Sequence, residues 1–297
     1  MDIKDVLIIG AGPAGIATAI QLKRYNIEPV LLEQEEIGGL LRNAHLVENY
    51  PGFPEGIRGL DLVGLFKKQL KNTGVKVSFE RVLELEYRDR VFFTKTNRGV
   101  ITSSIVVIAT GTKPRTISAP PISDDIKDRI LYEINPILGM TNKKIVIIGA
   151  GDAAFDYALN LSQRNEVVIM NRSERAQCIP VLLERCLKSE NISYLRQVSV
   201  REINKEDNKL LLTCIHRDSQ NGNQIYADYV IVATGRDPCL DFLGGESKRN
   251  LKTLINANKL HMVGDVRNGI YRQTAICVGD GIKTAMKIYR DIGREDT

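Results

Sequence analysis

The order of apolar and polar residues predicts the same three elements at two places in the chain. The first place is VLIIGAGPAGIATAIQLKRYN, residues 6–26, where an apolar run meets glycines and apolar residues then recur at helical spacing. This pattern predicts a buried strand, a tight turn through Gly10, Gly12 and Gly15, and a helix. The next apolar run, PVLLE, predicts a second strand that ends at Glu33.

The first glycine turn has the residues that a dinucleotide needs. Gly12 lets the backbone approach a pyrophosphate, and Gly15 lets the helix pack closely on the strand. The start of the helix, at Pro13 and Ala14, offers backbone N–H groups and a positive dipole to phosphate oxygens. Glu33 follows Gly12 by 21 residues, where a carboxylate can accept both ribose hydroxyls of an adenosine. The alternative is an ordinary tight turn, but strand, turn, helix, strand and acid together indicate a nucleotide site.

A second stretch, KKIVIIGAGDAAFDYALNLSQRN at residues 143–165, repeats this plan. Ala154 takes the place of the third glycine, and alanine there still permits close helix packing. The candidate coenzyme ligands in this turn and helix start are Gly149, Gly151, Asp152 and Ala153.

The strand that follows the second repeat, EVVIM, leads to Asn171 and not to an acid. Two basic residues, Arg172 and Arg175, come next. A missing carboxylate with guanidinium groups nearby suits a 2′-phosphate, which favours NADP over NAD. The alternative interpretation is two solvated arginines on the surface.

Two further segments are alike: IVVIATGTKPR at residues 105–115 and VIVATGRDP at 230–238. Each is an apolar strand that ends in Ala-Thr-Gly, before a basic residue and a proline. We expect each to close a nucleotide-binding domain and to begin a crossing to the other domain. Their glycines, Gly111 and Gly235, are candidate cofactor ligands.

The expected fold class is α/β, with two Rossmann-like nucleotide-binding domains and the second inserted into the first. Residues 1–115 and 236–297 would form the discontinuous first domain, and residues 116–235 the second. A chain of 297 residues is long enough for two domains with a core each.

Composition and charge exclude several classes of protein. The chain is 43% hydrophobic and 26% charged, which is typical of a globular protein. Its formal charge of +5 is far from the dense basic clustering of a nucleic-acid binder, but it can steer an acidic partner protein. Because no run of 18 apolar residues occurs and the N-terminus reads as a strand, we expect neither a membrane span nor a signal peptide.

The five cysteines are scattered and form no Cys-x-x-Cys pair, which indicates buried thiols in a reducing cytoplasm. If one helix includes both Cys178 and Cys186, they lie about 12 Å apart, too far for a disulfide. We interpret Cys277 as a packing residue and His45 as a packing or surface residue, with proton transfer as the alternative for His45. The three histidines show no metal-ligand spacing, so no metal site is expected.

Two longer motifs, together with the paired Ala-Thr-Gly turns, are specific enough to indicate a family. They are GGLLRNAHLVENYPGFPEGIRG at residues 38–59 and VGDVRNGIYRQTAICVGDG at 263–281. On these residues the chain resembles the low-molecular-weight thioredoxin reductases and their relatives, over essentially its whole length. The resemblance implies FAD in the first domain, NADPH or NADH in the inserted domain, and a cytoplasmic homodimer.

The resemblance also implies roles for single residues. In the first motif, Gly39, Leu40 and Asn49 hold positions that line the flavin or its ribityl chain. In the second motif, Asp265 corresponds to a residue that bonds the link between the ribityl chain and the pyrophosphate. The residues whose backbone would meet the flavin pyrimidine are Arg272, Gln273 and Thr274. A helix that begins at Thr274 would aim its dipole at the flavin N1–C2=O edge and stabilise the reduced anion.

The chain departs from this family where electrons would leave. Disulfide reductases of the family carry Cys-x-x-Cys shortly before the second glycine turn, where this chain has YEINP at residues 132–136. Without thiols there, the usual relay from flavin to a disulfide is missing. We interpret residues 129–144 as an interdomain connector. The basic cluster after the second coenzyme strand is also reduced, to NRSER.

The sequence therefore predicts an FAD-dependent NAD(P)H oxidoreductase without a redox-active disulfide. Its electrons would pass through FAD to an external acceptor, either a carrier protein such as ferredoxin or flavodoxin or a small molecule. Two alternatives stay open: a thioredoxin reductase-like enzyme that acts on an external disulfide, and a non-catalytic flavin-binding sensor. No residue is assigned a catalytic role, and neither nucleic acid nor membrane is an expected partner.

Overall fold

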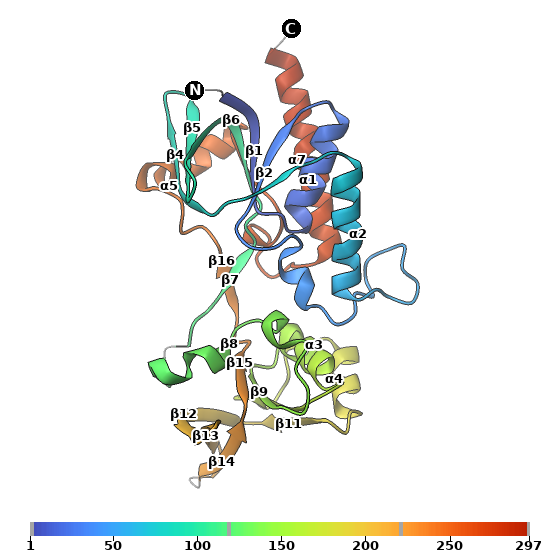
Figure 1. Ribbon diagram of the computed structural model, residues 1–297, viewed down its shortest axis with the longest axis vertical. Coiled ribbons are helices and arrows are strands. Elements are labelled where there is room, and N and C mark those ends of the chain that lie inside the picture. The colour runs from blue at the N-terminus through green and yellow to red at the C-terminus, as the bar shows by residue number, and fades with distance from the viewer. Residues whose placement is uncertain (1–2, 118–119, 220–221, 296–297) are drawn as a thin grey trace. The chain divides into compact units, whose positions relative to one another are not determined.

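The chain folds into two compact units (Figure 1). The computed structural model describes residues 3–117, 120–219 and 222–295. Unit 1 consists of residues 1–42, 47–113 and 237–297, and unit 2 of residues 43–46 and 114–236. The chain passes from one unit to the other after residues 42, 46, 113 and 236, and the last two of these crossings lie near the two Ala-Thr-Gly segments. Each of these two crossings is a short strand, β7 (Thr112–Pro114) or β16 (Arg236–Pro238), and the two strands pair with each other.

Unit 1 is built on a seven-stranded sheet with β1 (Ile3–Ile9) near its centre. β1 pairs in parallel with β2 (Pro29–Glu33) on one side and with β6 (Val100–Ile108) on the other. The strand order is β3-β2-β1-β6-β5-β4, and β17 (Leu260–Met262) pairs in parallel with β6. The other strands are β3 (Val77–Phe79), β4 (Val82–Arg88) and β5 (Val91–Thr96).

Three long helices, α1 (Pro13–Arg24), α2 (Gly59–Asn72) and α7 (Thr274–Glu295), lie together in unit 1 (Figure 1). A side chain at Gly281 of α7 would place its Cβ 2.3 Å from the carbonyl oxygen of Ala14 in α1. Only glycine allows these two helix backbones to approach so closely. The shorter helices of this unit are η1 (Gly39–Asn43, whose last residue belongs to unit 2), α5 (Gly245–Arg249), α6 (Leu251–Asn256) and η4 (Gly264–Val266).

Unit 2 has a five-stranded parallel sheet of order β11-β10-β9-β15-β8 and a three-stranded antiparallel sheet of order β12-β13-β14. The parallel strands are β8 (Ile130–Leu131), β9 (Lys144–Ile148), β10 (Glu166–Asn171), β11 (Ile192–Arg196) and β15 (Tyr229–Val232). The antiparallel strands are β12 (Val198–Glu206), β13 (Lys209–His216) and β14 (Gly222–Ala227). The helices are α3 (Asp152–Leu161), α4 (Pro180–Leu187), η2 (Asp124–Arg129) and η3 (Asn135–Ile137).

Both predicted strand–turn–helix–strand repeats are confirmed. The first is β1, α1 and β2, and the second is β9, α3 and β10. Most apolar side chains in the strands of both repeats are buried, because helices or a second sheet cover them. The predicted α/β class with two Rossmann-like nucleotide-binding folds therefore holds for the described residues.

The interpretation of residues 129–144 as a connector between domains is wrong. This segment forms β8, which pairs with β15 at the edge of the parallel sheet, and then η3. Ile134 and Ile137 are buried in the core of unit 2, with exposed fractions of 0% and 2%. Apolar side chains at these positions bury surface against α3 and β9, so the segment stabilises unit 2 rather than only leading into it.

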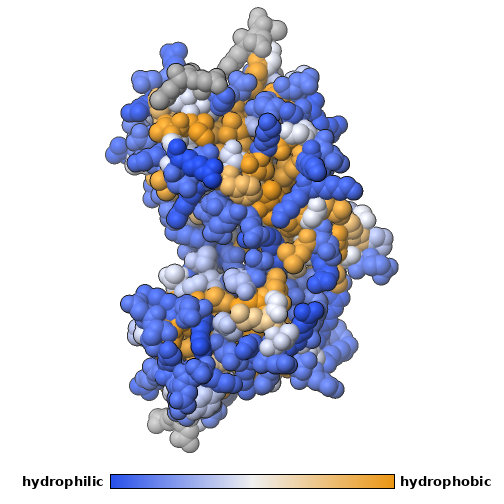
Figure 2. Space-filling view, viewed as in Figure 1, coloured by the Kyte–Doolittle hydropathy of each residue, from blue (hydrophilic) through white to orange (hydrophobic). Residues whose placement is uncertain are grey.

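Polar residues cover most of the visible face in Figure 2, and apolar patches interrupt them on both units. Among the described residues no helix combines the length and the apolar character that crossing a membrane requires.

Candidate functional site

Each of the three glycines in the first turn is needed for a different physical reason. Gly10 has φ +106°, and a Cβ there would lie 2.5 Å from the carbonyl oxygen of Ala109. A Cβ on Gly15 would lie 1.9 Å from the carbonyl oxygen of Gly10. A Cβ on Gly12, in contrast, would meet nothing within 4 Å. Gly10 and Gly15 are thus needed for packing, whereas Gly12 leaves open space beside the helix start at Pro13, as a bound phosphate requires.

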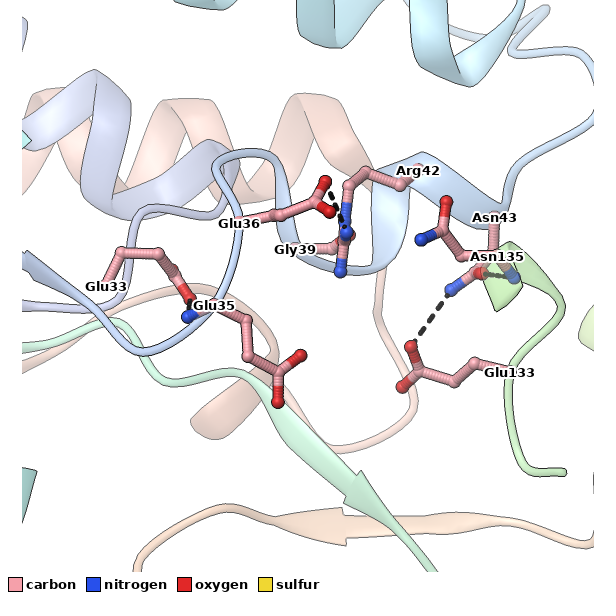
Figure 3. A network of polar contacts seen from close by, with 8 residues as sticks. All are labelled: Glu33, Glu35, Glu36, Gly39, Arg42, Asn43, Glu133 and Asn135. Carbon is pink, nitrogen blue, oxygen red and sulfur yellow. Dashed lines mark hydrogen bonds and ion pairs between the residues drawn. The ribbon is translucent and has the colours of Figure 1, made fainter. Parts of the chain in front are cut away.

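The Glu33 carboxylate accepts a hydrogen bond from the backbone of the first glycine turn. Its Oε2 accepts a hydrogen bond of 2.8 Å from the N–H of Ala11. Its Oε1 accepts one of 3.0 Å from the N–H of Glu35, and both of these glutamates are drawn in Figure 3. An ionised carboxylate has about four lone-pair positions, so it can still accept hydroxyl groups. The predicted ribose acceptor therefore lies where it was expected, next to the glycine turn.

The loop after β2 packs on the same turn. Gly38 donates a hydrogen bond of 2.8 Å to the carbonyl of Ala11. Gly39 has φ +55°, and its Cβ position lies 3.4 Å from the Cα of Gly12. The guanidinium of Arg42 bonds the Gly39 carbonyl at 3.3 Å and the Glu36 carboxylate at 2.8 Å (Figure 3). Arg42 was not a candidate, yet it holds the turn that carries the predicted flavin ligands.

The two motifs that indicated a family come together in unit 1. Asn49 donates a hydrogen bond of 2.8 Å to the side-chain oxygen of Gln273. The loop that carries Asn49 closes through paired backbone bonds between Val47 and Ile57, of 2.8 and 3.0 Å. Helix α7 begins at Thr274, as predicted, so its N-terminus lies directly beside Gln273.

Asp265 and its neighbours show contacts that the sequence did not predict. The thiol of Cys277 donates to Asp265 Oδ1 at 3.2 Å. Asp280 accepts hydrogen bonds from the Gly264 N–H at 3.2 Å and from Asn268 Nδ2 at 2.6 Å. Asp280 thus fixes the turn before α7. The only sequence signal for this role was its place between two glycines of a helix that packs closely on another.

The second glycine turn repeats the first in detail. Gly149 has φ +136°, and its Cβ would lie 2.3 Å from the carbonyl oxygen of Ala233. Gly151, like Gly12, would meet nothing within 4 Å, and Ala154 is fully buried. The structure thereby explains the two Ala-Thr-Gly turns, because in each repeat the alanine carbonyl packs against the first glycine of the fingerprint.

The glycines of the Ala-Thr-Gly turns have backbone angles that favour glycine. Gly111 has φ +62° and Gly235 has φ +129°. The N–H of Cys239 donates to the Gly111 carbonyl at 3.1 Å, and the N–H of Arg115 donates to the Gly235 carbonyl at 3.0 Å. Each glycine therefore fixes the start of a chain crossing.

The loop after β10 returns to the second glycine turn. Arg172 and Arg175 are exposed, as a phosphate contact requires. The Asp152 carboxylate accepts the N–H of Ile179 at 2.8 Å, and the N–H of Gln177 donates to the Ala150 carbonyl at 2.8 Å. Asp152, a predicted coenzyme ligand, is therefore also the residue that holds this loop against the turn. Ala153 is exposed beside Asp152 in the first turn of α3.

The segment without cysteines forms a polar network in unit 2. Glu133 pairs with Arg236 at 3.1 Å and accepts a bond of 3.3 Å from Asn43 Nδ2 (Figure 3). The N–H of Asn135 donates to Asn43 Oδ1 at 3.0 Å. Asn43 is buried, and the Asn160 side chain donates to its carbonyl oxygen at 3.5 Å.

Residues 43–46 therefore belong to unit 2, although the sequence placed the whole 38–59 motif in the first domain. The Asp156 carboxylate accepts the N–H of His45 at 3.0 Å. Burial, as the largest cause, raises the pKa of Asp156 to about 6, against the lowering effect of backbone bonds from His45 and Leu46. His45 Nδ1 lies 3.5 Å from Gln163 Nε2.

All five cysteines are reduced thiols in the described part of the chain. Cys186, Cys214 and Cys277 are buried, and burial raises the pKa of Cys186 to about 12 and that of Cys214 to about 11. Burial, with Asp265 beside it, also raises the pKa of Cys277. Thiols with raised pKa values are poor nucleophiles at neutral pH. Helix α4 begins after Cys178, so the argument from a shared helix does not apply to that residue.

No group of three or more potential metal ligands was found among the residues that the structure describes. The open positions at Gly12 and Gly151, each at a helix start without a side-chain cap, fit the phosphates of two dinucleotides. Two nucleotide-binding folds in one chain, one inserted in the other, define a protein of the dinucleotide-binding class with room for two dinucleotides.

The chain belongs to the pyridine nucleotide-disulphide oxidoreductase family, whose model matches residues 4–281. It is 28% identical to the thioredoxin reductase of Treponema pallidum over 294 residues, which cover 95% of this chain and 94% of that protein. The structure of the Lactococcus lactis thioredoxin reductase matches with a TM-score of 0.87 and 26% identity, and covers 98% of this chain and 99% of that one. The structure of the T. acidophilum thioredoxin reductase matches with a TM-score of 0.84 and 26% identity, and covers 97% of this chain and 98% of that one.

These comparisons confirm the predicted resemblance to the low-molecular-weight thioredoxin reductases and the predicted fold class. They also confirm that the chain is an NAD(P)H-dependent flavoprotein oxidoreductase of this type, with FAD and NADPH as the cofactors of the family.

Proposed function

We propose that this protein takes electrons from NADPH and passes them through FAD to an external acceptor, without an internal disulfide. The observation that carries the proposal is the polar network at Glu133 and Asn135. These residues belong to the segment 132–136, which takes the place of the redox pair in the disulfide reductases that the chain resembles. The Glu133 carboxylate accepts a hydrogen bond from the Asn43 amide, and the Asn135 N–H donates one to the Asn43 side-chain oxygen. Carboxylate and amide groups have no two-electron redox chemistry, and the five cysteines lie elsewhere in the chain.

In this proposal the parts 1–115 and 236–297 hold FAD. Gly12 and the start of α1 would bind the pyrophosphate, and Glu33 the adenosine ribose, because open space and an acceptor are present there. The other ligands proposed for FAD are Gly10, Pro13, Ala14, Gly15, Gly39, Leu40, Asn49, Gly111, Asp265, Arg272, Gln273 and Thr274. Bound FAD supplies the central chemistry, because it accepts a hydride and can release single electrons.

We propose that the N-terminus of α7 stabilises negative charge on the bound flavin. A helix of 22 residues that begins at Thr274 presents a partial positive charge and unbonded N–H groups at its first turn. The hydrogen bond between Asn49 and Gln273 holds the residues that lead into this turn. A fixed positive helix end favours the negative charge that develops on a flavin ring when it takes up two electrons.

Residues 116–235 are proposed to bind the nicotinamide coenzyme. Gly151 leaves space for its pyrophosphate, and Arg172 and Arg175 expose two guanidinium groups for a 2′-phosphate. The further ligands proposed are Gly149, Asp152, Ala153 and Gly235.

For the acceptor we propose a ferredoxin- or flavodoxin-like carrier protein, or a small molecule. The formal charge of +5 supports an acidic carrier, since complementary charge speeds encounter. The competing proposal is reduction of an external disulfide, which the names of the thioredoxin reductase relatives favour. A non-catalytic flavin sensor is the third candidate.

Anaerobic stopped-flow absorbance separates the three. We expect NADPH to bleach the flavin rapidly and ferredoxin or flavodoxin to restore its colour, while oxidised thioredoxin does not. Recovery with thioredoxin would favour the disulfide reductase, and a flavin that NADPH does not bleach would favour the sensor. Recovery with the carrier should slow as salt rises from about 0.01 to 0.1 M, because the Debye length falls from about 30 to 10 Å. Recovery with a neutral dye is the control and should hardly change.

A further inference from the structure

The side chain that ends β10 is completely engaged inside the protein. Asn171 has an exposed fraction of 5%. Its Nδ2 donates to the hydroxyl of Tyr194 at 2.8 Å and to the carbonyl oxygen of Arg175 at 3.0 Å. Its Oδ1 accepts the N–H of Ser173 at 2.9 Å. A side-chain amide has two N–H groups, so Asn171 has no donor left for a coenzyme.

Asn171 and Glu33 occupy equivalent positions in the two repeats, but their side chains make different contacts. Each residue ends the strand that follows its glycine turn and helix. Glu33 accepts bonds from the turn and keeps acceptor capacity for a ribose. Asn171 instead shapes the loop that carries Arg172 and Arg175.

Tyr194 gives this arrangement a fixed support. It lies on β11, where its backbone pairs with Ile169 of β10. Its ring packs edge-on against Phe155 of α3, with ring centroids 5.3 Å apart. Because strand pairing and ring packing both fix Tyr194, its hydroxyl holds the Asn171 amide in one orientation. That orientation in turn places the backbone of Arg175.

The far end of the same loop is fixed independently. Asp152 accepts the N–H of Ile179, and Gln177 donates to the carbonyl of Ala150 in the glycine turn. Between these ends the acid Glu174 is turned to Arg196, at 3.2 Å. This exposed pair is weak, but it draws a carboxylate away from its two neighbouring guanidinium groups. The carboxylate between Arg172 and Arg175 is thus paired with Arg196 of β11, and both loop arginines are exposed.

We infer that Tyr194 and Asn171 are positioning residues that set the preference for a coenzyme with a 2′-phosphate. They touch no part of the coenzyme and act through the backbone of Arg175. The inference rests on the proposed binding of NADPH by unit 2.

The test is calorimetric binding of 2′,5′-ADP and of 5′-AMP to the whole flavoprotein, with Tyr194→Phe as the variant. The variant keeps the ring on Phe155 and removes only the hydroxyl. Loss of one hydrogen bond should weaken 2′,5′-ADP binding about threefold to tenfold and leave 5′-AMP binding unchanged. Tyr226→Phe is the matched control, since it removes a tyrosine hydroxyl bonded to Glu206 at 3.2 Å on the antiparallel sheet of the same unit. This control should change neither constant.

Asn171→Asp is the second variant. It removes both N–H donors and adds a negative charge beside the loop, so the preference for 2′,5′-ADP over 5′-AMP should fall at least about tenfold. Equal weakening of both ligands, or a lowered melting temperature with an unchanged preference, would mean a purely structural role and would overturn the inference. If the wild-type protein binds both ligands equally, the proposed NADPH preference itself fails. An unchanged preference in both variants, with the wild-type preference intact, overturns only the roles of Tyr194 and Asn171.

Discussion

Asn49 and Gln273 are joined by a hydrogen bond of 2.8 Å, although 224 residues separate them in the chain. Each comes from one of the two motifs that indicated flavin binding, and the fold of unit 1 brings them side by side. The pair lies directly before the N-terminus of α7. The two motifs therefore meet in unit 1, and under the proposed function changes in either should affect the same property, the retention of FAD.

Gly12→Val should give a folded protein that retains no FAD. A Cβ at this position meets no protein atom within 4 Å, so the fold can accept it, but the side chain fills the space proposed for the pyrophosphate. Flavin absorbance after gel filtration, together with far-UV circular dichroism, measures both effects. A yellow Gly12→Val protein would show that the pyrophosphate lies elsewhere.

Gly15→Val is the matched control for that experiment. Its Cβ would lie 1.9 Å from the carbonyl oxygen of Gly10, which forces α1 away from β1. We expect this variant to lose thermal stability even when excess FAD is present. The two glycines thus separate a binding effect from a packing effect within one turn.

Arg172→Ala should lower the preference for NADPH over NADH. A charge-assisted contact to phosphate is worth about 1.5–3 kcal/mol, or on the order of ten- to a hundredfold in affinity. The measurement is the ratio of KM values for NADPH and NADH, and Arg201→Ala, which removes an exposed arginine from β12, is the control. An unchanged ratio would exclude Arg172 as the phosphate ligand.

Replacement of all five cysteines with alanine should leave reduction of an artificial one-electron dye essentially intact. The reason is that Cys186, Cys214 and Cys277 are buried thiols with raised pKa values, and Tyr132 and Asn135 lie where the resemblance expects the redox pair. Dye reduction under NADPH measures this. The prediction is wrong if one single replacement stops acceptor reduction while NADPH still bleaches the flavin, because that pattern requires a thiol relay.

Ile134→Ala should destabilise the protein by about 2–5 kcal/mol. Its side chain has an exposed fraction of 0% in the core of unit 2, so truncation leaves a cavity. Leu187→Ala, at a position with an exposed fraction of 63%, should change stability by no more than about 0.5 kcal/mol. Denaturant unfolding followed by circular dichroism compares the two. Equal effects would mean that the segment around Ile134 is not part of the core.

Asp156 should make stability depend on pH between about 4 and 6. Burial raises its pKa in the folded protein from 3.8 to about 6, so the folded state binds the proton more tightly than the unfolded chain does. The stability that this proton contributes is complete below pH 4 and is lost as the pH rises through 6, by about 2–3 kcal/mol. Asp156→Asn does not titrate, and its unfolding midpoint should lack this fall relative to wild type. Parallel pH profiles for both proteins would contradict the assignment.

The sequence alone determined the elements around both glycine turns. Gly10, Gly12 and Gly15 follow an apolar run and precede a helical pattern, and these signals are local, since each depends on residues within one or two turns of chain. The start of α7 at Thr274 and the end of β2 at Glu33 were predicted for the same reason. The resemblance of two long motifs then indicated the family.

Only the tertiary structure decided which residues far apart in the chain contact one another. Nothing near Asn171 in the chain reveals that Tyr194, on the next strand of the sheet, accepts its hydrogen bond. Likewise, Ile134 looked like part of a linker until its burial under α3 showed otherwise. Burial and long-range hydrogen bonds depend on which elements pack together, and that packing is fixed by the whole chain at once. A local pattern therefore predicted the positions of the proposed cofactor ligands, whereas the fold determined which residues hold those positions in place.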